Sequence, residues 1–126
     1  MRRIFFLLSL LLGAFWFSLG YAAPEVGLAV VTNQPPVISG SPTLTVTVSS
    51  SYSFTPTASD ANGDKLTFSI TNKPAWATFD AVTGKLSGKP AATNVGTTTG
   101  ITIQVTDGKS TAVSLPAFSL TVVQPL

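Results

Sequence analysis

Hydrophobic and polar residues alternate strictly along five stretches of the chain, and no window repeats apolar residues at the spacing of an amphipathic helix. Strict alternation places one set of side chains on one face of a strand, which can then pack against a core. Turn-forming pairs such as Asn62-Gly63 and Asp107-Gly108 lie between the stretches. The pattern therefore predicts a nearly all-β domain with strands at residues 44–48, 52–57, 66–71, 101–106 and 118–123.

Short strands punctuated this often are typical of two packed sheets. We therefore expect a β-sandwich of about seven strands, the architecture of immunoglobulin-like and cadherin-like domains, and a barrel is the less favoured alternative. Pro56 has no N–H to donate to a neighbouring strand. The strand that starts at Tyr52 should therefore lie at a sheet edge or end at this proline.

The N-terminal segment has the profile of a signal peptide. Arg2 and Arg3 precede an apolar run, which small residues follow at positions 20–23. Cleavage after Ala22 is favoured over cleavage after Ala23, and an uncleaved membrane anchor is the alternative. We expect a signal peptide at 1–22, an extension or linker at 23–34 and a β-sandwich at 35–124. Alternating apolar residues at 26–30 leave two interpretations of the extension open, an extra edge strand or a tether.

Composition excludes several classes of function. The chain has no cysteine and no histidine, which removes disulfides, thiol nucleophiles and catalytic schemes that need an imidazole. Two of its seven basic residues, Arg2 and Arg3, lie in the expected signal, so the rest only balance the five acidic residues. No basic patch for nucleic acid remains. We expect a domain that is not an enzyme.

Several segments, in order, resemble the dystroglycan-type cadherin-like domains, which overlap with the immunoglobulin-like repeats of bacterial surface proteins. The resemblance covers about residues 33–123. The segments that carry it are Asn33-Gln34-Pro35-Pro36-Val37-Ile38, Tyr52-Ser53-Phe54, Ala58 to Ile70, Lys73 to Asp80, Thr83 to Pro90, Ile103 to Gly108 and Phe118 to Val122. It implies a Greek-key sandwich used as an extracellular spacer or adhesion module, with calcium at domain boundaries in the cadherin branch. Trp76 and Phe79 would then plug the end of the sandwich.

Calcium prefers six to eight oxygen ligands, and the plausible source of them here is one cluster of acids and an amide. The candidate metal ligands are Asp60, Asn62, Asp64 and Asp107. The family resemblance places Asp60 and Asn62 at the paired acids of the cadherin pattern and Asp107 at its later acid. Ser87-Gly88-Lys89-Pro90 departs from the Asp-Arg-Glu segment of true cadherins. The alternative is that these side chains only cap tight turns.

The expected function is a non-catalytic exported module for adhesion, binding or structure, with calcium as a candidate ion. A carbohydrate-binding module that uses exposed Tyr52, Trp76 or Phe79 is the alternative. The expected partner is a protein or a component of the cell envelope, with self-association through edge strands as a further option. We expect the chain to be periplasmic, secreted or on the surface of a bacterium, with membrane contact only through an uncleaved signal.

Overall fold

The computed structural model describes residues 29–126, which form ten strands and one short 3-10 helix. The chain divides into a segment, Met1–Thr32, and a domain, Asn33–Leu126. The expected signal peptide lies outside the described residues, and residues 29–34 form no strand. The elements are β1 (Val37–Ser39), β2 (Thr45–Thr47), β3 (Tyr52–Phe54), β4 (Thr57–Ser59), β5 (Thr67–Thr71), β6 (Ala77–Phe79), β7 (Leu86–Gly88), η2 (Ala92–Asn94), β8 (Gly96–Thr106), β9 (Val113–Ser114) and β10 (Phe118–Val123).

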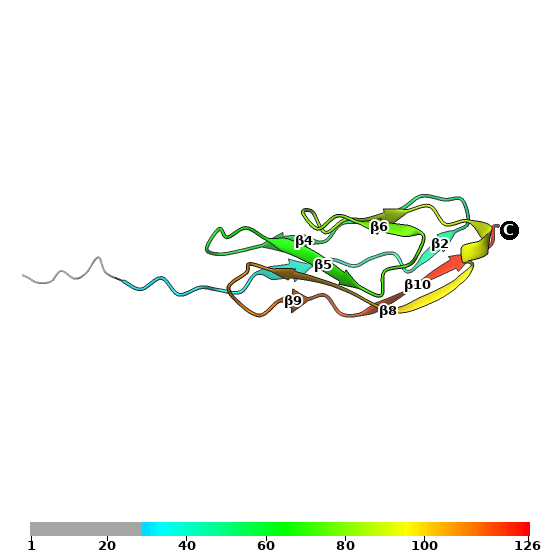
Figure 1. The fold of residues 1–126 in the computed structure, drawn as a ribbon. Helices are drawn as coiled ribbons and strands as arrows, with labels where there is room; N and C mark the ends of the chain where they lie inside the picture. The colour runs from blue at the N-terminus through cyan, green and yellow to red at the C-terminus, as the bar shows by residue number, and fades with distance from the viewer. Residues whose placement is uncertain (1–28) are drawn as a thin grey trace, which may run out of the picture. The chain divides into compact units, whose positions relative to one another are not determined.

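The strands of the domain lie in two layers. The larger sheet has the order β2-β10-β8-β5, with β9 beside β8. Strand β2 runs parallel to β10, and the other strand pairs of this sheet are antiparallel. The second layer holds the sheet β3-β7-β6 and the pair β1-β4. Figure 1 shows β4 and β6 on one side, facing β8, β9 and β10 on the other. The expected all-β sandwich is confirmed.

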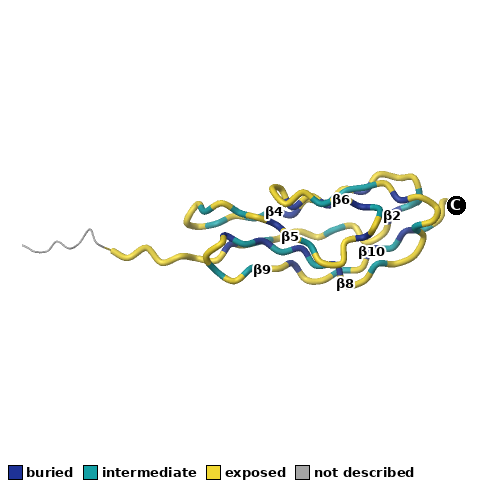
Figure 2. The backbone as a smooth tube through the Cα atoms, viewed as in Figure 1, coloured by how far each residue is buried: buried dark blue, intermediate teal, exposed yellow. Residues whose placement is uncertain are grey.

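The core lies between the two layers, where the alternating apolar side chains of both meet (Figure 2). Strand β8 contributes Ile101, Ile103 and Val105, each fully buried, and Leu86 of β7 lies opposite with no exposed surface. The intervening polar residues of β8 point away from the core and are only partly exposed. Burial of this apolar surface is the main stabilising contribution in a domain without disulfides.

The long strand β8 changes its partners along its length because of an irregularity near Gly100. The register with β10 shifts between the pairs Phe118↔Ile101 and Leu120↔Thr98. Gly100 has φ +68°, which glycine adopts without steric cost, as in a β-bulge. From Ile101 onward the apolar side chains of β8 face the core, whereas residues 96–99 before the bulge are glycine and threonine.

All five predicted strands are present, but the sequence pattern missed short ones. The segment at 52–57 is divided into β3 and β4 around Pro56, and β3 is an edge strand, as that proline predicted. This division, together with the unpredicted strands β1, β6, β7 and β9, gives ten strands where about seven were expected. Leu44, expected to face the core, is 52% exposed and precedes β2, which begins at Thr45.

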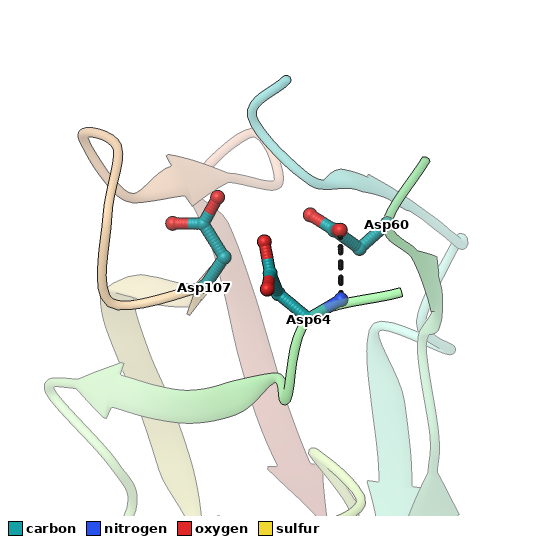
Figure 3. Close-up of side chains that lie close together, drawn as sticks. All are labelled: Asp60, Asp64 and Asp107. Carbon is teal, nitrogen blue, oxygen red and sulfur yellow. Dashed lines mark hydrogen bonds between the residues drawn. The ribbon is translucent and has the colours of Figure 1, made fainter. Parts of the chain in front are cut away.

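The two ends of the domain differ in what they present. The first residues of the domain lie at the end that carries the β4–β5 loop, where the Gln34 N–H donates to Asn62, and the C-terminus lies at the opposite end (Figure 1). The end with the β4–β5 loop also carries the turn after β8, as the close-up in Figure 3 shows. Within residues 29–126 we find no helix with the length and apolar character needed to cross a membrane.

Candidate metal centre

The first loop of the candidate site begins at Asp60, directly after β4. The Asp60 Oδ1 atom accepts hydrogen bonds from the backbone N–H groups of Asn62 (2.9 Å) and Asp64 (3.0 Å). Aspartate side chains commonly fold the chain back in this way, because they mimic a backbone carbonyl. The loop is therefore shaped by one oxygen of Asp60, which leaves the second oxygen for another use. Figure 3 draws the bond from the Asp64 nitrogen.

The second loop begins at Asp107, the residue after β8, which is 7% exposed. Its Oδ1 atom accepts hydrogen bonds from the backbone N–H groups of Lys109 and Ser110, each at 2.8 Å, and from the Ser110 hydroxyl at 2.9 Å. Its Oδ2 atom accepts a bond of 2.8 Å from the side-chain amide of Asn33. Asp107 therefore holds both its own turn and the start of the domain.

Sheet pairing brings the two loops together. The antiparallel register of β5 and β8 pairs Thr67 with Thr106. The residues just before β5 and just after β8 consequently lie at the same edge of the sheet. One carboxylate oxygen from each of Asp60, Asp64 and Asp107 lies within 4.8 Å of the others, and Figure 3 shows the three side chains converging.

Two oxygens of this cluster have no hydrogen-bond partner. The Oδ2 atoms of Asp60 and Asp64 are both inaccessible to solvent and unpartnered. Burying a carboxylate oxygen without a partner is costly, and a cation is the usual compensation. Carboxylate oxygens are also the ligands that Ca²⁺ prefers. The residues present therefore fit a hard divalent cation such as Ca²⁺.

The electrostatics of the cluster are set by these contacts. The hydrogen bond from Asn33, followed by the one from the Ser110 N–H, holds the pKa of Asp107 well below its usual range. Lys109 places its Nζ atom 2.6 Å from Asp64 Oδ1. The pKa of Lys109 is raised, first by this hydrogen bond and then by the charge of Asp64. Asp107 therefore carries a negative charge and Lys109 a positive charge at neutral pH.

Asn62, the fourth predicted ligand, contacts the start of the domain. Its Oδ1 atom accepts a hydrogen bond of 2.7 Å from the backbone N–H of Gln34. Asn33, the residue before Gln34, donates its side-chain amide to Asp107. Neither contact is predicted by the sequence pattern, because the partners of Asn33 and Gln34 lie 74 and 28 residues further along the chain.

The aromatic residues of the alternative carbohydrate site lie in or against the core. Tyr52 is 5% exposed and donates its hydroxyl to the Thr43 carbonyl at 2.9 Å. Trp76 meets Tyr52 edge to face, with ring centroids 6.1 Å apart, and is partly buried against the core together with Phe79. Tyr52 and Trp76 therefore pack against each other, and all three aromatic side chains are at least partly buried.

Residues 35–123 match the model of the family called Putative Ig domain. No curated protein matches the chain. Among solved structures, the domain is similar to the SrpA adhesin of Streptococcus sanguinis, with a TM-score of 0.57 and 14% identity over 76% of this chain. It is also similar to an endo-fucoidan hydrolase of glycoside hydrolase family 107, with a TM-score of 0.52 and 28% identity over 80% of this chain.

A third similar structure is that of a putative α-galactosidase from Bacteroides fragilis, with a TM-score of 0.54 and 17% identity over 78% of this chain. The chain spans 60% of the length of the adhesin, 15% of the fucoidan hydrolase and 19% of the galactosidase. The structural likenesses therefore concern a domain within larger proteins, and they agree with an immunoglobulin-like fold.

Proposed function

Because the chain belongs to the Putative Ig domain family, we propose that it is a non-catalytic exported module, used for structure or binding at the bacterial cell surface. The layout of the domain suits a spacer, since its first residues and its C-terminus lie at opposite ends of the sandwich (Figure 1). Partners would be a protein or a component of the cell envelope, recognised by surface complementarity. A cadherin-like kinship within the wider family is part of this proposal.

The finer proposal is that the module binds Ca²⁺ weakly through Asp60, Asp64 and Asp107. The observation that carries it is the pair of buried, unpartnered Oδ2 atoms of Asp60 and Asp64. One carboxylate oxygen of Asp107 lies within 4.8 Å of a carboxylate oxygen of each of these two residues. Backbone carbonyls and water would complete the six to eight ligands that calcium requires, and this small set of protein ligands favours a low affinity. Asn62 would help to hold the β4–β5 loop in place by accepting the hydrogen bond from the Gln34 N–H.

Thermal melting with EDTA and with calcium tests this site. Calcium at about 5 mM is roughly ten times the dissociation constant of a weak extracellular site, and binding to the folded state alone would add about 1.4 kcal/mol of stability. For a domain of this size the melting temperature should rise by several degrees. Mg²⁺ at the same concentration controls for unspecific screening, because it demands a more rigid octahedral shell.

Two matched variants locate the effect. Asp64→Asn keeps the shape of the side chain but removes its charge, and it should abolish the calcium shift. Asp80→Asn removes a charge from a turn outside the cluster and should leave the shift unchanged. An equal shift in both variants, or none in the wild type, would rule out calcium binding by the cluster.

Cell fractionation tests the proposed location. We expect an antibody against the folded domain to detect the protein outside the cytoplasm of the bacterium that produces it. Deletion of residues 2–22 should retain the protein inside the cell, because the apolar run that directs export would be missing. Export of the shortened chain would contradict the assignment of this segment as a signal.

A further inference from the structure

One lysine lies at the acidic cluster. Lys109 belongs to the turn that starts at Asp107, and its own backbone N–H donates to Asp107 Oδ1. Its side chain reaches across to the other loop, where Nζ lies 2.6 Å from Asp64 Oδ1. The Lys109 side chain is 59% exposed while that of Asp64 is 18% exposed, so the ammonium approaches the acids from the solvent side. The contact between Lys109 and Asp64 is the one ion pair within residues 29–126.

The ammonium is influenced by all three acids. The contact with Asp64 is the strongest influence on the pKa of Lys109, and the charges of Asp107 and Asp60 act in the same direction. Lys65 lies next to Asp64 in sequence and is exposed, as Lys109 is, but it forms no ion pair. Of these two neighbouring lysines, only Lys109 is placed as a counter-ion.

The oxygens of the cluster divide into those already occupied and those that are not. Turn hydrogen bonds use Asp60 Oδ1 and Asp107 Oδ1, Asn33 uses Asp107 Oδ2, and Lys109 uses Asp64 Oδ1. The remaining atoms are Asp60 Oδ2 and Asp64 Oδ2, both buried and unpartnered. Three carboxylates facing one ammonium leave two negative charges uncompensated, which is the charge of one divalent cation.

We propose that Lys109 is an internal counter-ion of this cluster, which joins the two loops when no metal is bound and lowers their affinity for a divalent cation. The inference deepens the proposed calcium site and rests on it for its metal ligands. Lys109 neutralises part of the negative charge and repels a second cation at close range. The domain therefore keeps the β4–β5 loop and the β8–β9 turn together without an ion, and calcium acts as a modulator of a domain that is already folded.

The test compares Lys109→Met with Lys65→Met in the whole protein. Methionine keeps much of the length of lysine but carries no charge, and Lys65→Met removes a charge at the same end of the domain without breaking an ion pair. Calcium affinity is measured by isothermal titration in about 0.1 M KCl, where long-range effects of surface charge are largely screened. We expect Lys109→Met to bind calcium about tenfold more tightly than wild type, and Lys65→Met to bind within about twofold of it.

A second measurement does not depend on calcium binding. In EDTA, the melting temperature of Lys109→Met should fall by roughly 2–5 °C, because the three carboxylates then repel one another without a counter-ion. Calcium should raise the melting temperature of Lys109→Met by more than it raises that of the wild type. Lys65→Met should melt in EDTA at the wild-type temperature.

The outcomes separate this inference from the proposed calcium function. Equal calcium affinity in wild type and Lys109→Met would overturn the inference and leave the function standing. Binding by Lys109→Met alone would support the inference and overturn calcium binding by the natural chain. Absence of binding in both, at calcium up to about 20 mM, would overturn both, since that concentration exceeds the range of weak extracellular sites. An unchanged melting temperature for Lys109→Met in EDTA would also overturn the role in joining the loops.

Discussion

Two aspartate turns of this domain have the same local design and different surroundings. In the β4–β5 loop, Asp60 Oδ1 accepts the N–H groups of Asn62 and Asp64. In the β6–β7 turn, Asp80 Oδ1 accepts those of Val82 (2.8 Å) and Thr83 (3.4 Å). Each turn also contains a glycine with positive φ, Gly63 at +75° and Gly84 at +78°.

What differs is the packing around each turn. The Asp80 turn is anchored by Gly84, where a Cβ atom would lie 2.7 Å from the Phe68 ring. Gly63 has open space around it, and the Asp60 loop is instead placed beside Asp64 and Asp107, whose carboxylates converge with its own. The Asp80 turn is a packing element, and the Asp60 loop leaves carboxylate oxygens available for a cation. One local motif thus takes different roles according to its tertiary neighbours.

The largest effect is expected for Gly84→Ala. The new methyl group would collide with Phe68 in the core, and the backbone would be strained at positive φ. Unfolding free energy should fall by ~3 kcal/mol, measured by urea denaturation. A loss below ~1 kcal/mol would show that the Asp80 turn is not anchored by packing against Phe68.

Asp107→Ala should have the next largest effect. It removes the acceptor for two backbone N–H groups, a hydroxyl and the Asn33 amide. We expect the melting temperature in EDTA to fall by roughly 10 °C. Asp80→Ala, which removes a carboxylate from an exposed turn, is the control and should lower it by about 2–4 °C. Equal losses would mean that the Asp107 and Asp80 turns depend equally on the hydrogen bonds of their carboxylates.

Gly63→Ala is the counterpart of Gly84→Ala at the acidic end. The two glycines have nearly the same φ, but nothing lies within 4 Å of the position that a Cβ would occupy at Gly63. Only the left-handed backbone conformation is then penalised, at ~1 kcal/mol. Urea denaturation of both variants gives the difference that packing alone contributes, and a Gly63→Ala cost equal to that of Gly84→Ala would remove the contrast.

The smallest effect is expected from acid. The folded-state pKa of Asp107 lies below that of an unfolded aspartate, about 3.9, so its contribution to stability is present above that pH and is lost as pH falls towards the folded pKa. The pKa of Asp80 is also lowered, chiefly by the Val82 N–H. Between about pH 5 and pH 2, the melting temperature of Asp107→Ala should fall by a few degrees less than that of the wild type. The fall for Asp80→Ala should be closer to the wild-type value. Identical acid profiles for wild type and Asp107→Ala would contradict this.

Local pattern was sufficient for much of the fold. Alternation at 66–71, 101–106 and 118–123 predicted β5, the second half of β8 and β10, because a residue's face in a strand depends only on its position in the alternation. Strands β1, β4, β6, β7 and β9 have two or three residues each and are too short to show a period. Leu44 was misplaced because β2 begins one residue later, at Thr45.

The candidate site was predictable in its residue types and not in its connections. Oxygen-bearing side chains in turn sequences pointed to Asp60, Asn62, Asp64 and Asp107. The structure brings the three carboxylates together and directs Asn62 to the backbone of Gln34. Asn33 and Lys109, which complete the cluster, carried no recognisable signal, since a contact between distant loops leaves no periodic trace in sequence.

The sequence by itself determined that this is a β-sandwich of low charge with aspartate turns at the ends of its strands, because alternation, turn chemistry and composition act over a few neighbouring residues. Tertiary structure decided which aspartates meet. The β5–β8 register places Asp64 beside Asp107, and the bonds from Asn33 and Gln34 fix the start of the domain against them. These arrangements depend on strand pairing across tens of residues, where only the packed sheets select one register among several with similar local preference.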